Sequence, residues 1–273
     1  MHILDKIVKH KRQEVDVRKQ LTSVTELKRS KHFGRATNSL LPKLQEASVP
    51  AIIAEFKRKS PSKQAINLDA DLLKVTGGYA QAGAAAISIL TDEFFFGGAD
   101  DFLKQVRVEL PVTPLLRKEF IIDEYQIYEA KAIGADIILL ITEILTKEEV
   151  TNFSKLARDL DLEVLLELHS EEQLDKYHDS VSYVGVNNRD LKTFSVDYER
   201  SKKLYDMLPT EVPKIAESGL SDPQVVSMLF NYGFSGFLMG EHFMRNDDPG
   251  AACARFIQSA HALAGRKLSL IHI

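Results

Sequence analysis

One stretch of the chain, VTPLLRKEFIIDEYQIYEAKAIGADIILLI (residues 112–141), shows the repeat that decides the fold. It begins with a short apolar run at 112–117, continues through an amphipathic segment at 123–134, and ends with a second apolar run at 135–141. Short apolar runs that alternate with longer amphipathic segments are typical of parallel strands joined by helices. The stretch therefore predicts a strand, a helix and a second strand parallel to the first.

The same repeat extends over most of the chain from residue 51 onward. Helical patterns fill the gaps between the apolar runs. Eight strand–helix units in about 220 residues predict a (β/α)8 TIM barrel of the α/β class, although periodicity alone also allows an open doubly wound sheet. The predicted strands are 51–56, 85–90, 112–117, 135–141, 162–168, 182–187, 213–217 and 235–239.

The N-terminal residues do not follow this repeat. Residues 1–35 contain ten Lys or Arg and four Asp or Glu, which leaves six excess positive charges. Ile3, Ile7 and Val15 follow helical spacing, and this predicts an amphipathic helix that packs on the barrel. Since no proline-rich or serine-rich linker follows, we expect residues 1–273 to form a single barrel domain with 1–45 as its helical extension.

Composition argues against several classes of protein. The chain has 273 residues, and 35 Lys and Arg against 39 Asp and Glu give a net charge of −4. This balance offers no general attraction to nucleic acid or to an acidic membrane, so we expect neither as a partner. The single cysteine, Cys253, permits no intrachain disulfide, and the longest apolar runs are far too short to span a bilayer. We therefore predict a soluble, cytoplasmic protein.

Polar residues gather where the predicted strands end. The active site of a (β/α)8 barrel lies at the carboxyl ends of its strands, so these residues are the candidates. In chain order they are Glu55, Lys57 and Ser60; Lys118; Glu167; Asn187, Asn188 and Arg189; Glu217, Ser218 and Gly219; Gly240 and Glu241.

Three of the candidates, Glu55, Glu167 and Glu217, directly follow an apolar run. Burial of an unpaired carboxylate is costly, so each is expected to have a cationic partner, for which Lys57 and Lys118 are available. Lysines and carboxylates around one barrel mouth suit proton transfer, because neighbouring charges shift each other's pKa. The eight histidines are scattered, and the chain has no dinucleotide fingerprint. We therefore expect acid–base chemistry with no metal and no cofactor.

The ends of the seventh and eighth strands suit an anion. The sequences ESG (217–219) and GE (240–241) contain small residues that let backbone N–H groups approach a ligand. Barrels frequently bind phosphate at this position. The phenylalanines at 94–96 and Phe120 could line the part of the site that binds an apolar portion of the ligand. These residues predict an enzyme or binding protein for a phosphorylated small molecule.

Seven segments, in order along the chain, resemble the indole-3-glycerol phosphate synthase family of tryptophan biosynthesis. They are IIAEFKRKSPSK (52–63), AAAISILTDEFFFGG (84–98), PLLRKEFIIDEYQIYEAKAIGADIILLI (114–141), LEVLLELHS (162–170), VGVNNRDLKTFSVD (184–197), IAESGL (215–220) and FLMGEHFM (237–244). The N-terminal extension also resembles the extra helix that this family carries over its barrel mouth. The resemblance implies a carboxy-lyase that closes 1-(2-carboxyphenylamino)-1-deoxyribulose 5-phosphate to indole-3-glycerol phosphate, releasing carbon dioxide and water.

The resemblance also implies catalytic roles. Lys118 matches the general acid that protonates the ribulose carbonyl, and Lys57 matches the lysine that pairs with the substrate carboxylate and assists proton transfer. Glu55 and Asn187 match residues that orient these groups. Glu167 matches the acidic residue of the later dehydration. Because Glu167 ends an apolar run, we expect a partly dehydrated environment that favours its protonated form.

The remaining matches imply contacts with the substrate. The phosphate cradle would comprise Ser60, Ser218, Gly219, Gly240 and Glu241, the last two mainly through backbone N–H groups. The anthranilate side would be lined by Phe96, Phe120, Leu139, Arg189 and Leu191, with Glu217 in the polar shell.

Two departures and three alternatives stay open. Gln64 stands where the family usually has glycine, so the loop after the first strand needs other backbone angles. Strand alternation favours Asn187 over Asn188 as the inward residue, but a one-residue slip would exchange them.

The alternative functions are a phosphoribosylanthranilate isomerase, which lacks the EFKRKSPS block, a noncatalytic phosphosugar-binding barrel, and a Schiff-base aldolase built on Lys118. The chain ends soon after the eighth unit, so we expect no fused isomerase domain, and we expect a monomer.

Overall fold

The structure is a computed structural model that describes residues 3–61, 63–189 and 195–268. All eight predicted strands are present, and they pair in parallel in chain order, with β1 pairing to β8 to close the barrel. The closed barrel rules out the open sheet that periodicity allowed. The strands are β1 (Ala51–Phe56), β2 (Ala86–Leu90), β3 (Leu115–Lys118), β4 (Ile137–Ile141), β5 (Glu163–Leu168), β6 (Tyr183–Asn187), β7 (Lys214–Glu217) and β8 (Gly236–Met239).

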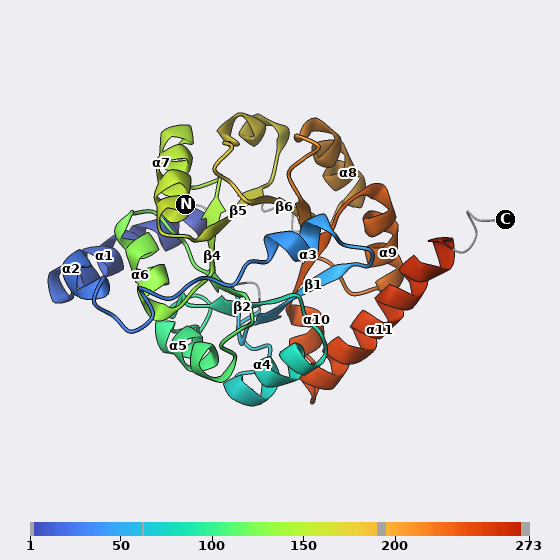
Figure 1. Cartoon of the computed structure of the whole chain (residues 1–273), viewed down its shortest axis with the longest axis horizontal. Helices are drawn as coiled ribbons and strands as arrows, with labels where there is room; N and C mark the ends of the chain where they lie inside the picture. Colours follow the sequence, from blue (N-terminus) through green and yellow to red (C-terminus); the bar gives the residue numbers. More distant parts are fainter. Residues whose placement is uncertain (1–2, 62, 190–194, 269–273) are drawn as a thin grey trace.

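Helices form a ring around the strands (Figure 1). The gap between β5 and β6 departs from the predicted repeat, because it holds a 3-10 helix, η1 (Glu171–Lys176). The α-helices that follow the strands are α4 (Leu72–Gln81), α5 (Asp100–Glu109), α6 (Tyr125–Ile133), α7 (Lys147–Asp159), α8 (Tyr198–Met207), α9 (Pro223–Tyr232), α10 (Glu241–Met244) and α11 (Pro249–Leu268).

Side chains alternate along each strand between the ring of helices and the barrel interior. On β5, Val164 and Leu166 pack with the helices, whereas Leu165 belongs to a separate inner cluster. This period of two is the ordinary geometry of a strand. The inner cluster includes Ile53, Leu116, Leu139, Leu165, Tyr183, Ile215 and Leu238.

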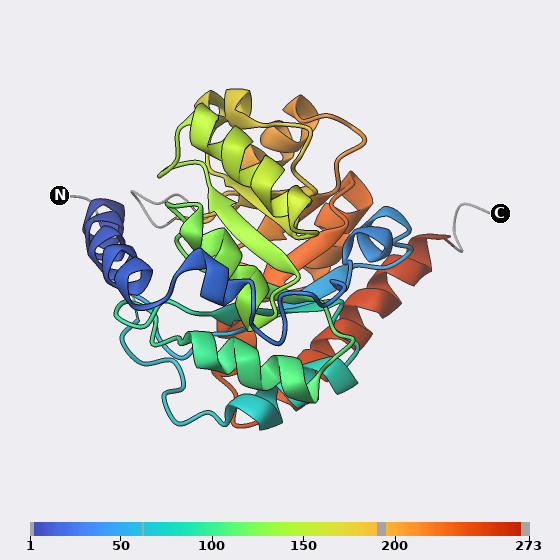
Figure 2. The same cartoon turned by 60° about the vertical axis from the view of Figure 1, so that its left-hand side comes forward.

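The N-terminal extension contacts both ends of the barrel. It comprises α1 (Ile3–Leu21), α2 (Val24–Leu27) and α3 (Leu41–Gln45). Nζ of Lys11 on α1 lies 3.1 Å from Asp92 Oδ2 and 3.0 Å from Glu119 Oε1, just beyond the carboxyl ends of β2 and β3. Leu44 of α3 joins the inner cluster. The helix α3 therefore closes the amino ends of the strands, whereas α1 stands beside α6 at the edge of the molecule (Figures 1 and 2).

Candidate active site

The alternation that builds the core also gathers the predicted catalytic side chains. Residues two apart on a strand share a face, so a polar residue two or four positions beyond an inner side chain points into the barrel mouth. Five predicted residues meet this condition, namely Glu55, Lys118, Glu167, Asn187 and Glu217. They come from five different strands and meet at one end of the barrel.

Lys118 lies at the centre of this group. Its Nζ is 2.9 Å from Glu217 Oε2 and 3.7 Å from Glu167 Oε2, and 15% of its side chain is exposed. Burial by itself would lower the pKa of a lysine. The carboxylates of Glu217, Glu167 and Glu55 outweigh burial, however, and raise the pKa of Lys118 well above its ordinary value. Lys118 is therefore protonated at neutral pH.

Glu217 is the carboxyl group that titrates near neutral pH. Burial raises the pKa of Glu217 to about 7, because the attraction of Lys118 only partly offsets burial and the repulsion of Glu167. Among the described residues, no hydrogen-bond partner faces its buried Oε1 atom. Glu217 can therefore gain or lose a proton under the conditions in which the site would work.

Glu167 is ionised, and the prediction of a protonated Glu167 is wrong. Its Oε1 accepts a hydrogen bond from Asn187 Nδ2 at 2.9 Å and lies 3.0 Å from His169 Nε2. Burial opposes the charged form, but Lys118, His169 and Asn187 outweigh it and hold the pKa of Glu167 far below its ordinary value. The apolar run indicated the burial correctly, but it did not show that His169 and Asn187 join Lys118 in stabilising the charged form.

A second lysine–carboxylate pair lies across the mouth. Lys57 Nζ is 2.8 Å from Glu55 Oε1, and Ser88 Oγ donates to Glu55 Oε2 at 3.3 Å. Burial would raise the pKa of Glu55, but Lys57 and Lys118 lower it. The mouth thus holds two ammonium groups and three carboxyl groups, one of which titrates near pH 7.

The turn after β7 has an unusual backbone. Ser218 and Gly219 both adopt positive φ angles, of 66° and 70°. Such angles are uncommon for a serine and often mark functional sites. A Cβ atom on Gly219 would lie 2.6 Å from the side chain of Val196. The turn therefore accepts little besides glycine at this position.

The loop after β1 meets the turn after β8. The carboxylate of Glu241 is paired with Lys63 and Arg245. Ser60 and Lys63 exchange backbone hydrogen bonds of 2.8 and 3.0 Å. Among the described residues, the non-glycine positions with positive φ are Asp161 and Ser218, so Gln64 fits this loop without left-handed backbone. The departure at Gln64 leaves the loop intact.

Aromatic and apolar residues lie on another side of the mouth. The rings of Phe96 and Phe120 are 5.7 Å apart, and Phe120 packs in the inner cluster with Leu139. Leu191 lies outside the described residues.

The two adjacent asparagines point in opposite directions. Asn187 donates to Glu167 inside the barrel and accepts from the backbone N–H of Arg189 at 3.0 Å. Asn188 donates to the backbone oxygen of Ser218 at 2.9 Å and accepts from Ser201 Oγ at 2.6 Å. Asn187 is therefore the residue of the pair that belongs to the barrel mouth.

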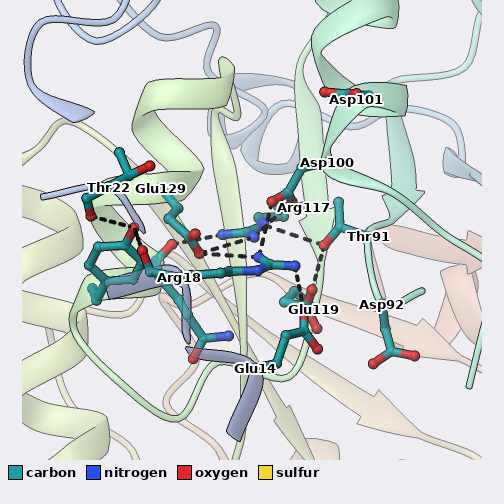
Figure 3. A network of polar contacts seen from close by, with 12 residues as sticks. Glu14, Arg18, Thr22, Thr91, Asp92, Asp100, Asp101, Arg117, Glu119 and Glu129 are labelled. Carbon is teal, nitrogen blue, oxygen red and sulfur yellow. Dashed lines mark hydrogen bonds and ion pairs between the residues drawn. The ribbon is translucent and has the colours of Figure 1, made fainter. Parts of the chain in front are cut away.

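The neighbours of Lys118 in the chain are held from outside the barrel. Arg117 and Glu119 belong to a polar network that includes residues of α1 (Figure 3). Arg117 Nη2 is 2.8 Å from Asp100 Oδ1, and Arg18 Nη1 of α1 is 3.0 Å from Asp100 Oδ2. The network fixes the backbone on both sides of Lys118 and ties it to α1.

Comparison with known families matches residues 4–256 to the family described as Indole-3-glycerol phosphate synthase. The chain belongs to the indole-3-glycerol phosphate synthase family. It is 44% identical over 259 residues to the indole-3-glycerol phosphate synthase of Bacteroides thetaiotaomicron, covering 94% of this chain and 98% of the relative. It is 42% identical over 269 residues to that of Salinibacter ruber, covering 98% and 99%.

Family membership confirms the resemblance found in the sequence. It also confirms the predicted enzyme class, because indole-3-glycerol phosphate synthases are carboxy-lyases of tryptophan biosynthesis. Over the described ranges, no helix combines the length and the apolar character that a membrane span requires.

Solved structures with lower sequence identity share the fold alone. Tryptophan synthase subunit alpha from Legionella pneumophila superposes with a TM-score of 0.61 at 15% identity, covering 83% of this chain and 97% of that one. KGPDC from Streptococcus mutans superposes with a TM-score of 0.60 at 16% identity, covering 79% and 99%. Both support the barrel assignment.

Sequence reasoning missed two residues that contact the predicted carboxylates of the candidate site. Ser88 donates to Glu55 from the interior face of β2, and His169 contacts Glu167. Both had a signal, because His169 stands two positions beyond Glu167 and Ser88 stands two positions beyond Ala86, which belongs to the inner cluster. An apolar run such as AISIL hides a single inward serine unless the alternation is followed residue by residue.

Proposed function

We propose that this chain closes the indole ring of 1-(2-carboxyphenylamino)-1-deoxyribulose 5-phosphate to give indole-3-glycerol phosphate, carbon dioxide and water. The observation that carries the proposal is Lys118, a protonated amine whose Nζ lies 2.9 Å from Glu217 in the barrel mouth. A second ammonium group, on Lys57, is held by Glu55 at 2.8 Å. The reaction needs one acid for a carbonyl oxygen and one cation for a carboxylate, and the mouth contains both.

Lys118 would act first. The anthranilate ring carbon that bears the carboxylate attacks the ribulose carbonyl carbon, a carbon–carbon bond forms, and the carbonyl oxygen takes a proton from Lys118. A developing alkoxide is more basic than an amine, so the raised pKa of Lys118 still permits this transfer. The cation is already in place before reaction, which is how preorganised charge lowers a barrier.

Lys57 would hold the carboxylate that is lost. Three N–H donors project from a lysine ammonium, so Lys57 can remain paired with Glu55 and still bind a substrate oxygen. When carbon dioxide leaves, the electron pair of the broken bond returns to the ring and restores its aromaticity.

Glu167 would accept a proton in the last step. The hydroxyl on the former carbonyl carbon leaves as water with a proton from Lys57, while the proton lost from the substrate passes to Glu167. This direction follows from the lowered pKa of Glu167, which makes it a base at neutral pH. Asn187 and His169 keep the carboxylate oriented toward the mouth.

The phosphate would bind at the ends of β7 and β8. The two successive positive φ angles at Ser218 and Gly219 support this assignment, because such turns direct backbone N–H groups into a shared concavity that suits an anion. The carboxylate of Glu241 is already neutralised by Lys63 and Arg245, so it would not repel the ligand. Ser60 and Gly240 complete the proposed cradle.

The aromatic end of the substrate would face the apolar side of the mouth. Phe96, Phe120 and Leu139 offer the surface, and the family resemblance adds Arg189 and Leu191 to this group. We also propose that residues 1–273 form a single domain that works as a monomer. The buried Cys253 is compatible with the cytoplasm.

The test uses the purified chain with two substrates in parallel. The carboxyphenylamino-deoxyribulose phosphate should yield indole fluorescence, whereas phosphoribosylanthranilate, the substrate of the alternative isomerase, should not be consumed. Consumption of only the second compound would indicate an isomerase. If neither compound is turned over, the chain would be a binding protein without catalytic activity. Irreversible trapping of substrate on Lys118 by borohydride would instead indicate Schiff-base chemistry.

A further inference from the structure

A glycine on β6 lies where the carboxylate of Glu217 enters the barrel interior. Gly185 stands two positions before Asn187, so a side chain at this position would point inward. A Cβ atom there would overlap Glu217 Oε1 and would lie 3.2 Å from both Glu217 Cδ and Leu165 Cδ1. Gly185 has no positive φ, so backbone conformation does not explain the glycine. The absent side chain provides the space that the carboxylate occupies.

We propose that Gly185 is a positioning residue, whose lack of a side chain lets Glu217 reach Lys118. The inference rests on the proposed function, because it assigns Gly185 a part in setting the Lys118 ammonium. Glu217 Oε2 contacts Lys118 Nζ at 2.9 Å, while Oε1 occupies the space over Gly185. One oxygen is thus placed by Lys118 on β3, and the other by the space over Gly185 on the neighbouring β6.

The other lysine–carboxylate pair is built in the same way. A Cβ atom on Gly240, just after β8, would lie 2.9 Å from both Cβ and Oε1 of Glu55 on the adjacent β1. In each pair, a glycine on a neighbouring strand leaves space for the carboxylate that holds a lysine. Because the same arrangement occurs in both pairs, it supports the interpretation that each glycine is present to leave room for a carboxylate.

The structure can accommodate an alanine at 185 through a movement of one side chain, that of Glu217. The overlapped atom is the end of a flexible side chain, so Glu217 can rotate away while the backbone stays in place. Rotation removes the carboxylate from Lys118 and leaves the fold intact. We therefore expect Gly185→Ala to lower kcat by about 10²-fold, the scale of an approximately 1 Å misplacement, with a much smaller change in KM.

The matched control is Gly236→Ala. Gly236 is also an inward strand glycine without positive φ, and a Cβ atom there would lie 2.7 Å from Ile215 and 3.0 Å from Leu44. An added Cβ atom at Gly236 is also closer to its neighbour than ordinary van der Waals contact, but that neighbour is no catalytic side chain, so the folded variant should keep wild-type kcat. If both alanine variants lose kcat to the same extent, general packing explains the effect and the proposal is overturned.

A double-mutant cycle tests the inference without relying on turnover. Gly185→Ala should lower the urea unfolding midpoint in the wild-type background, and this shift should shrink by about half or more in the Glu217→Ala background, where the overlap is absent. Additive shifts would overturn the proposal. If Gly185→Ala fails to fold but the double variant folds, the proposal is supported; if both fail, it is overturned. Absent wild-type turnover would refute the proposed function, and the cycle would still test Gly185.

Discussion

Replacement of Lys118 by methionine perturbs the site in two measurable ways. The methionine keeps most of the bulk and removes the acid, so turnover should fall by about 10²–10⁴-fold, the range for general acid catalysis. The substitution also leaves Glu217 and Glu167, at 2.9 and 3.7 Å from Nζ, without their shared cation. Loss of one partner from a buried ion pair costs about 3–5 kcal/mol of unfolding free energy.

This loss of stability should depend on pH. The folded-state pKa of Glu217 is about 7, above its ordinary value, so the group contributes stability at low pH that is lost as pH rises through 7. Without Lys118, which lowers that pKa, the value rises further. Urea unfolding should therefore show a smaller destabilisation of Lys118→Met near about pH 5.5, where only Glu167 is charged, than near about pH 8.5, where Glu217 is charged as well.

The control is Lys131→Met, which removes a buried lysine on α6, away from the barrel mouth. Burial lowers the pKa of Lys131, so its replacement should cost little stability at either pH. If Lys118→Met is destabilised equally at both pH values, Lys118 is not the cation that Glu217 and Glu167 share. Near-normal turnover in that folded variant would remove Lys118 from the acid role.

Four further predictions follow from the same contacts. Glu167→Gln should lower kcat with affinity retained, and single-turnover traces should show carbon dioxide released before indole forms; simultaneous slowing of both signals would place Glu167 earlier. In the wild type, kcat should rise as pH increases through about 7 while Glu217 ionises, and a pH profile of Glu217→Gln should lack this limb. Gly219→Val should raise KM and weaken competition by inorganic phosphate, because its side chain would meet Val196 and its φ is 70°; unchanged constants would move the phosphate elsewhere. Lys11→Met should cost about 3–5 kcal/mol in urea unfolding, since Lys11 is 1% exposed among Glu14, Asp92 and Glu119; a loss within experimental error would mean that α1 is held by apolar contacts alone.

The fold was predictable because each strand is a compact apolar run bounded by polar residues. Runs such as 51–56 and 162–168 matched β1 and β5 within a residue at each end. The gap between β5 and β6 was less predictable, since a 3-10 helix of six residues carries too little periodicity to be told from an α-helix. Closure of the barrel was suggested by the number of strand–helix units and by the family resemblance, not by any single segment.

The site was predictable in position and only partly in chemistry. Alternation locates Glu167 and Glu217 on the inward face, and a resemblance supplies roles for them. Their protonation depends largely on partners from other strands, because Glu167 faces Lys118 and Asn187 whereas Oε1 of Glu217 faces Gly185. Such contacts between distant segments leave no local pattern, which is why the protonated carboxyl was predicted at the wrong glutamate.

The most direct test of the account is a simultaneous measurement of carbon dioxide and indole from one sample. The purified chain, mixed with excess 1-(2-carboxyphenylamino)-1-deoxyribulose 5-phosphate, should release both products in equal amounts, and Lys118→Met should release neither at a comparable rate. Equal amounts from the wild type, together with loss of both in the variant, would support ring closure driven by Lys118. Carbon dioxide and indole formed by the folded variant at the wild-type rate would contradict it.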